Sequence, residues 1–231
     1  ITDGDIRRTI ENKKNIFIYN HLAAVESNQL ANGHSFSIDS HFVSAKILMS
    51  KYNDSGQRIV RASRKNEYWR SEYYSRLSNI VVHTPESDKL DETPSEKKRR
   101  KESFFIDAQE AFNENRPLAI APEGTSETPD NVTNKSPGPF KPGAFLLANS
   151  LDPRPMIIPI ALANFDFPIS KTVYSAVIKE GFYIDDFVDV NDSIALSGFL
   201  NEYRKKFRGY VEEAIELARN IETLPPKRKK E

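Results

Sequence analysis

The sequence predicts an α/β domain, with a mixed central sheet flanked by helices on both faces and a long amphipathic helix at the C-terminal end. Two patterns carry this prediction. Short apolar or β-branched runs alternate with helical patterns along most of the chain, and large apolar residues recur at helical spacing near its end. Such alternation is typical of three-layer α/β domains. Because 231 residues fit one domain, we expect a single domain over residues 1–224 and a basic tail over residues 225–231.

Six short runs predict the strands of the sheet. Each is rich in β-branched or apolar residues, and turn formers flank most of them. In chain order the runs are Asn15–Tyr19, Arg58–Ala62, Asn79–His83, Leu118–Ala121, Met156–Leu162 and Val173–Ile178.

Three helical patterns complete the domain, and apolar residues three or four positions apart mark the inward face of each. Gly209 is a point at which the C-terminal pattern could divide into two helices. The stretch Pro85–Lys101 is charged and poor in large apolar residues, so it predicts an exposed loop. The inward faces are Phe42, Val43, Ile47 and Leu48 within Asp39–Ser50; Phe104, Phe105, Ala108, Ala111 and Phe112 within Ser103–Asn113; and Leu196, Phe199, Leu200, Tyr203, Phe207, Tyr210, Val211, Ala214 and Ile215 in the C-terminal helix.

The charge balance excludes recognition that relies on net charge. The chain has 33 Lys and Arg against 33 Asp and Glu, so we expect no nucleic-acid partner. The basic clusters Lys97–Lys101 and Lys227–Lys230 fit a charged loop and a charged tail. They would also favour contact with an anionic membrane surface.

Residue types exclude further classes of function. The chain has no cysteine, which removes thiolate nucleophiles, disulfides and cysteine-based metal sites and suits a cytoplasmic setting. The longest strongly apolar run, Met156–Ala163, is too short to span a bilayer, and the first residues contain no apolar core of a signal peptide. No spacing typical of a metal site is present, so we expect no metal.

The histidines provide the candidate for a base that works near neutral pH. His34 is followed five positions later by Asp39, at the start of a helical pattern. A carboxylate about one turn away can bind one imidazole nitrogen and leave the other to remove a hydroxyl proton. We therefore interpret His34 and Asp39 as a base and its orienting carboxylate. The second choice is His21, which directly follows a predicted strand and has Glu26 at the same spacing.

A second motif follows the fourth predicted strand. Residues Pro122–Ser126 read PEGTS, and Pro139–Phe145 read PFKPGAF. The order of these motifs after the histidine and aspartate, with a later strand that contains a central proline, resembles the glycerol-phosphate and lysophospholipid acyltransferase family. The resemblance covers about Asn15 to Ile184.

The resemblance implies an activity. It implies transfer of a fatty acyl group from acyl-CoA or acyl carrier protein to a hydroxyl of a lysophospholipid or glycerol-phosphate acceptor, in glycerophospholipid synthesis or remodelling. The thioester would be the donor substrate, and no separate cofactor is expected. The protein would work peripherally at a membrane surface.

The resemblance also assigns site residues. His34 would act as the base and Asp39 would orient it. The acceptor would be bound by Glu123, Gly124, Thr125 and Ser126, and Lys141 would contact a phosphate as a point charge.

Two positions depart from the family pattern. Gly33 stands where the family usually has asparagine, and Ser126 stands where enzymes that act on small phosphate acceptors usually have arginine. The middle family motif is matched only by Ile80–Thr84. These departures leave an alternative, a catalytically degenerate lipid-binding or membrane-surface protein of the same fold.

Overall fold

A six-stranded sheet forms the centre of the computed structural model, which describes residues 14–22, 37–63, 68–83, 92–126, 135–168 and 172–222. The strand order is β3-β2-β4-β1-β5-β6. The neighbouring strands from β3 to β5 pair in parallel, whereas β6 runs antiparallel to β5. The predicted mixed sheet is therefore confirmed. The strands are β1 (Asn15–Tyr19), β2 (Gln57–Arg61), β3 (Ile80–Val82), β4 (Leu118–Ile120), β5 (Met156–Ala163) and β6 (Ser175–Ile178).

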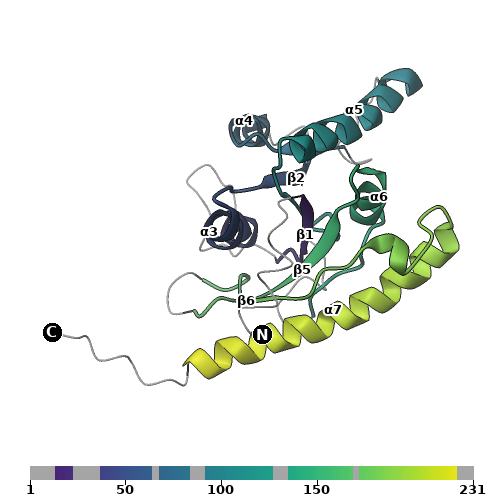
Figure 1. The fold of residues 1–231 in the computed structure, drawn as a ribbon. Helices are drawn as coiled ribbons and strands as arrows, with labels where there is room; N and C mark the ends of the chain where they lie inside the picture. The colour runs from purple at the N-terminus through teal and green to yellow at the C-terminus, as the bar shows by residue number, and fades with distance from the viewer. Residues whose placement is uncertain are drawn as a thin grey trace.

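The pleat of β1 divides the core into two halves. Ile16 and Ile18 join a cluster with buried residues of three helices, whereas Phe17 and Tyr19 join a second cluster with residues of the helical segment that follows β1. The three helices are α5 (Pro94–Asn113), α6 (Gly143–Ser150) and α7 (Ser193–Glu222). Successive side chains of a strand point to opposite faces, so these two clusters lie on opposite sides of the sheet. Figure 1 shows the resulting helix-covered sheet. The predicted three-layer arrangement is confirmed.

The helical segment after β1 is not a regular α-helix. It consists of α2 (Ile38–Phe42), a π-helix η2 (Val43–Leu48) and α3 (Met49–Tyr52), which together correspond to the helix predicted over Asp39–Ser50. Val43 and Leu48 are fully buried against the sheet. A π-helix is rare, and its single extra residue per turn is often found beside functional sites.

Helix α5 (Pro94–Asn113) begins nine residues earlier than Ser103, so the prediction of a loop as far as Lys101 is wrong for Pro94–Lys101. The reason is a capping box at its start, which apolar periodicity does not detect. The Glu96 carboxylate accepts a hydrogen bond from the Thr93 N–H at 2.8 Å, and the Glu96 N–H donates to the Thr93 hydroxyl at 3.3 Å. Pro94 occupies the first helical turn, where its missing N–H has no cost.

The first half of α5 projects beyond the sheet (Figure 1), and its side chains are exposed almost all round. Phe105, which the pattern places on the inward face, is 40% exposed. The inward face instead begins with the half-buried Phe104 and continues through buried Ala108, Ala111 and Phe112.

Helix α7 (Ser193–Glu222) is one uninterrupted helix of 30 residues, so Gly209 does not divide it. Its buried face lies against β5 and β6 and includes Leu200, Tyr203, Phe207 and Val211, as predicted. Within the described residues, no helix combines the length and the apolarity that crossing a bilayer requires. The basic tail lies outside the described residues. The other helices are α4 (Tyr68–Arg76), α6 (Gly143–Ser150) and the 3-10 turn η4 (Ile184–Asp186).

Candidate active site

The candidate site lies at the carboxyl ends of β1 and β4. These strands are parallel neighbours, so the residues that follow them meet at the same edge of the sheet. Asn20 and His21 follow β1, and the turn that contains Glu123 and Gly124 follows β4. The two segments are joined directly, because the His21 N–H donates to the Glu123 carboxylate oxygens at 3.3 and 3.4 Å.

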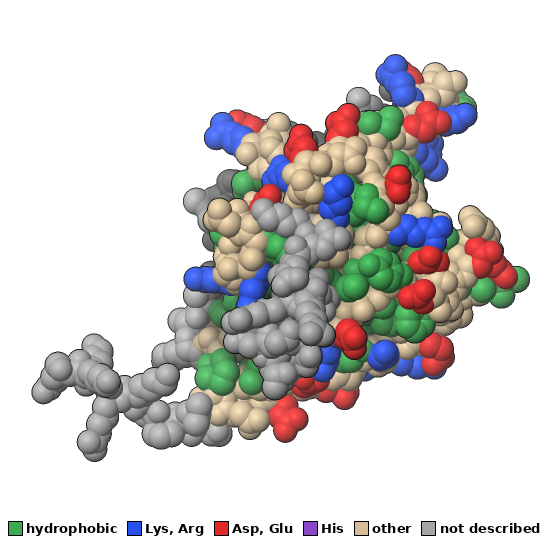
Figure 2. Space-filling model, in the orientation of Figure 1, with side chains coloured by type: hydrophobic (Ala, Val, Ile, Leu, Met, Phe, Trp, Pro, Cys, Tyr) green, Lys and Arg blue, Asp and Glu red, His purple; other side chains and the backbone are tan. Residues whose placement is uncertain are grey.

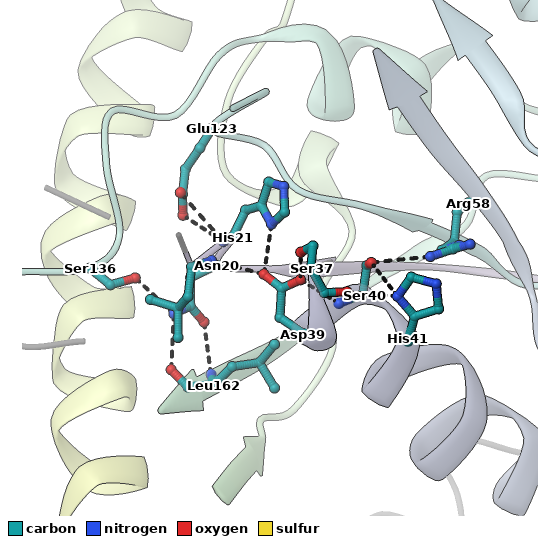
Figure 3. Close-up of polar contacts among 11 residues, drawn as sticks. Asn20, His21, Ser37, Asp39, Ser40, His41, Arg58, Glu123, Ser136 and Leu162 are labelled. Atoms are coloured by element: carbon teal, nitrogen blue, oxygen red, sulfur yellow. Dashed lines mark hydrogen bonds and ion pairs between the residues drawn. The ribbon is translucent and has the colours of Figure 1, made fainter. Parts of the chain in front are cut away.

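Asn20 fixes the start of the segment that carries His21. Its side chain is fully buried and donates to the Ser136 hydroxyl at 2.7 Å and to the Leu162 carbonyl at 2.9 Å. The Leu162 N–H returns a hydrogen bond to the Asn20 side-chain oxygen at 2.7 Å. The amide therefore ties the end of β1 to β5 and to the segment before α6 (Figure 3), and a buried amide satisfied in this way resists rotation.

His21 and Asp39 form a close pair. The His21 Nδ1 lies 2.6 Å from Asp39 Oδ2, which also accepts the Leu22 N–H at 2.8 Å. The other oxygen, Oδ1, accepts the Ser37 hydroxyl and the Ser40 N–H, the latter at 2.5 Å. The carboxylate thus lies among four donors at the start of α2 (Figure 3).

These donors determine the ionisation of Asp39. Burial by itself would raise the pKa of this carboxyl, but the charge and hydrogen bond of His21, together with the bonds from Ser37 and Leu22, outweigh it and lower the pKa below its usual value. The ionised carboxylate orders the imidazole with Nδ1–H as donor, so Nε2 carries the lone pair of the neutral ring. The pair can therefore act as an oriented base.

The sequence pairs Asp39 with His34, and the structure presents a different partner. His34 and Glu26 both lie outside the described residues. His21, the second choice, is the histidine that Asp39 binds, across a separation of eighteen positions along the chain. Asp39 itself is placed in the site as predicted, with 1% of its side chain exposed.

The Glu123 carboxyl contacts the backbone of His21 and does not line the cavity. The predicted role for Glu123 is acceptor binding, but its carboxyl is buried and is absent from the described residues that line the cavity beside His21. Burial raises the pKa of Glu123 well above its usual value, and the Asp39 charge raises it further, while the hydrogen bonds from the His21 and Gly138 backbone and the charge of Arg204 act in the opposite direction. Its direct contacts include the backbone of His21 and the backbone of Gly138.

The other residues of the PEGT turn face the cavity with Lys141. Gly124 has a φ of 72°, a conformation that a side chain would strain. A Cβ at this position would meet Lys141 Nζ at 3.1 Å and Cδ at 3.2 Å. The Lys141 N–H donates to the Pro122 carbonyl at 2.8 Å, which joins the two family motifs. Gly124, Thr125, Ser126 and Lys141 thus lie together, as the sequence predicts.

The cavity has a volume of about 460 Å³ and unites these elements. His21 lines it together with Ser40, Arg58 and the PEGT turn. Its size lies within the range of about 300 to 1,000 Å³ that is typical of small-molecule sites.

A second histidine on the cavity wall is not singled out by the sequence as a base. The His41 Nδ1 lies 2.6 Å from the Ser37 carbonyl, so this nitrogen is the donor and Nε2 accepts the Tyr73 hydroxyl. Burial lowers the pKa of His41, the Ser37 bond raises it, and the positive charge of Arg58 lowers it further. The net lowering favours a neutral ring. Within the described residues no group of three or more His, Asp or Glu side chains is placed to hold a metal ion.

Comparisons with known proteins add little to this geometry. No family model matches the chain. No curated protein matches it either. Among solved structures, it is similar to the Legionella pneumophila ATPase DotB, at 13% identity and a TM-score of 0.31. The likeness covers 98% of this chain, which spans 62% of the DotB chain. Similarity at this level supports no conclusion about function.

Proposed function

We propose that the protein is an acyltransferase. It moves a fatty acyl group from acyl-CoA or acyl carrier protein to a hydroxyl of a glycerol-phosphate or lysophospholipid acceptor. The observation that carries the proposal is the His21–Asp39 pair, because His21 lines the same cavity as Gly124, Thr125, Ser126 and Lys141. The pair provides a base and the cavity provides space for an acceptor beside it. The motifs that resemble the acyltransferase family supply the reaction class.

The reaction needs one proton transfer in each direction. Nε2 of His21 accepts the proton of the acceptor hydroxyl as its oxygen attacks the thioester carbonyl carbon. The tetrahedral intermediate then expels the thiolate, which takes the proton back from the imidazolium. The products are an ester and a free thiol. Asp39 stays ionised throughout, holds the ring by Nδ1 and stabilises its positive charge.

We further propose that the protein works peripherally at a cytoplasmic membrane surface. The projecting end of α5 carries the exposed cations Lys97, Lys98 and Arg99, and Figure 2 shows Lys and Arg side chains gathered at this end with acidic ones between them. Ile106, farther along the helix, is 56% exposed. Cations beside exposed apolar side chains favour anionic lipid surfaces. The test is co-sedimentation with anionic vesicles. If the double change Lys98→Glu and Arg99→Glu leaves it unaffected, this helix is excluded as the membrane contact.

The activity can be tested by a mass-spectrometric acceptor screen of the full chain with both donor types. The acceptors are glycerol 3-phosphate, lysophospholipids and monoacylglycerol. We expect acyl transfer that His21→Ala lowers by about 10² to 10⁴, the usual contribution of a general base. His34→Ala is the matched comparison, and we expect it to retain activity.

Two outcomes would contradict the proposal at different levels. If His34→Ala abolishes transfer and His21→Ala does not, the base is assigned to the wrong histidine. If the intact protein acylates none of the acceptors but binds vesicles, it is a lipid-binding protein of this fold and not an enzyme.

A further inference from the structure

The cavity beside His21 is positively charged, although the whole chain has no net charge. Among the described residues that line it, Arg58, Arg61 and Lys141 are cationic and none is Asp or Glu. The chain as a whole has 33 basic and 33 acidic residues. A cavity with charges of one sign and apolar walls concentrates ligands of the opposite sign.

Arg58 is the unusual member of this group, because the pleat places it on a core-facing side of the sheet. It pairs in register with Ala119 of β4, which in turn pairs with Phe17 of β1. Both of these neighbours belong to the core cluster beneath the segment α2–α3. Only 7% of Arg58 is exposed. Arginine is almost never buried to this extent unless it has a charged partner.

No carboxylate partner for Arg58 is present among the described residues. Its Nη1 donates to the Ser40 hydroxyl at 3.1 Å, and the described part of the chain provides it with no ion pair. The Asp39 carboxylate, on the same helix as Ser40, accepts from four other donors and not from Arg58. The neighbouring His41 is favoured in its neutral form, in part by the charge of Arg58 itself.

A buried guanidinium without a counter-ion destabilises a fold, and an apolar side chain of similar size would usually serve stability better. An arginine buried at such a position, with no carboxylate partner among the described residues, therefore indicates a ligand that supplies negative charge. Phosphate fits this requirement, because its oxygens match the planar fork of a guanidinium. Lys141, on the same cavity, adds a point charge.

We propose that Arg58 binds the phosphate group of the acceptor, and that this acceptor is a small phosphomonoester such as a glycerol phosphate. The inference rests on the proposed function, because it takes the bound molecule to be the acceptor of acyl transfer. Arg58 contacts Ser40, the residue next to the Asp39 that holds His21 (Figure 3). A bound phosphate would thus lie near the base. In a glycerol phosphate the hydroxyl and the phosphate are a few bonds apart, whereas in acyl-CoA a long arm separates the thioester from the phosphates.

The test is calorimetric titration of the full chain with inorganic phosphate, glycerol 3-phosphate and CoA. We expect Arg58→Met to weaken the binding of glycerol 3-phosphate at least tenfold. Arg58→Lys should weaken this binding less, because lysine keeps the positive charge but lacks the planar pair of donors of a guanidinium. The matched control is Arg154→Met, an exposed arginine before β5 at the opposite edge of the sheet. It should leave the affinity unchanged.

Thermal unfolding provides a second, independent readout. Without ligand, Arg58→Met should melt at the same temperature as wild type or higher, because it removes a buried charge that no carboxylate of the described segments balances. Added phosphate should raise the melting temperature of wild type and not of the variant. A clear loss of melting temperature without ligand would show that Arg58 serves the fold, and the proposal would be overturned.

The remaining outcomes separate this inference from the proposed function. Affinity for glycerol 3-phosphate within threefold of wild type in both Arg58→Met and Arg58→Lys overturns the phosphate site, even if acyl transfer is observed. If Arg58→Met weakens the binding of CoA and leaves the binding of glycerol 3-phosphate unchanged, the assignment of Arg58 to the acceptor phosphate is overturned. If glycerol 3-phosphate binds in an Arg58-dependent way but no acyl transfer is observed, the phosphate site is supported and the proposed acyltransferase activity is refuted.

Discussion

The contacts of Asp39 make the change Asp39→Asn a sensitive probe of the proposed base. All four groups around the carboxylate donate to it, and two of them, the Leu22 and Ser40 N–H groups, are backbone donors that cannot reverse. They bind different oxygens, so an asparagine must turn its own NH₂ group toward one of them. A buried donor left unsatisfied in this way costs about 1–3 kcal/mol of stability.

The same change acts on the ring of His21. An amide NH₂ directed at His21 would make Nδ1 the acceptor and place the proton on Nε2, which then cannot remove a hydroxyl proton. We expect kcat to fall by about 10² to 10⁴, which corresponds to about 2.7 to 5.5 kcal/mol of transition-state stabilisation. The KM for the acceptor should change much less, because Asp39 is not among the described residues that line the cavity.

Two assays check this expectation. Steady-state acyl transfer gives kcat and KM, and nitrogen NMR of labelled histidine reports the tautomer of His21 without relying on turnover. Asp54→Asn is the matched control, since Asp54 lies before β2 at the opposite edge of the sheet. The reasoning is refuted if folded Asp39→Asn protein retains kcat within threefold of wild type, or if its His21 keeps the proton on Nδ1.

Two further predictions concern the PEGT turn. Burial raises the pKa of Glu123 above its usual 4.5, so its contribution to stability is fully present below about pH 4.5 and is lost as the pH rises through the folded-state pKa. The free energy of unfolding of wild type should therefore fall with rising pH relative to Glu123→Gln, and parallel urea-unfolding curves would contradict this. Gly124→Ala should destabilise by about 1–2 kcal/mol through its positive φ and should raise the acceptor KM by displacing Lys141. Gly209→Ala, whose added Cβ meets nothing within 4 Å, should instead stabilise α7, and equal effects of the two changes would count against the strain.

The sheet could be predicted because its signals are local. The runs that form β1 and β5 contain enough adjacent apolar residues to mark a buried strand without reference to the rest of the chain. The start of α5 also has a local signal, but this signal is a helix-capping motif and not a periodic spacing of apolar residues. Thr93, Pro94 and Glu96 are the residues of a capping box with proline in the first turn, and a search for caps would have found it.

The pairing in the site could be predicted only in part, because it depends on tertiary structure. Asn20 and His21 are correctly placed by their position after β1, yet the carboxylate that meets His21 comes from a different element. Sequence spacing cannot identify that partner before the packing of α2 on the sheet is known. Arg58 was still harder to assign, since an arginine in a short strand is ordinarily exposed and only the register reveals its burial.

The π-helix η2 sets the rotational phase between the site and the core. Asp39 precedes it, while Val43 and Leu48, within it, are buried beneath the sheet. Successive residues of an α-helix are rotated by about 100° about the helix axis. If the same residues formed a regular α-helix, the start of the helix would rotate by about that angle while the buried residues kept their places. Asp39 would then point away from His21, so the wider turn of η2 keeps the carboxylate directed at the imidazole.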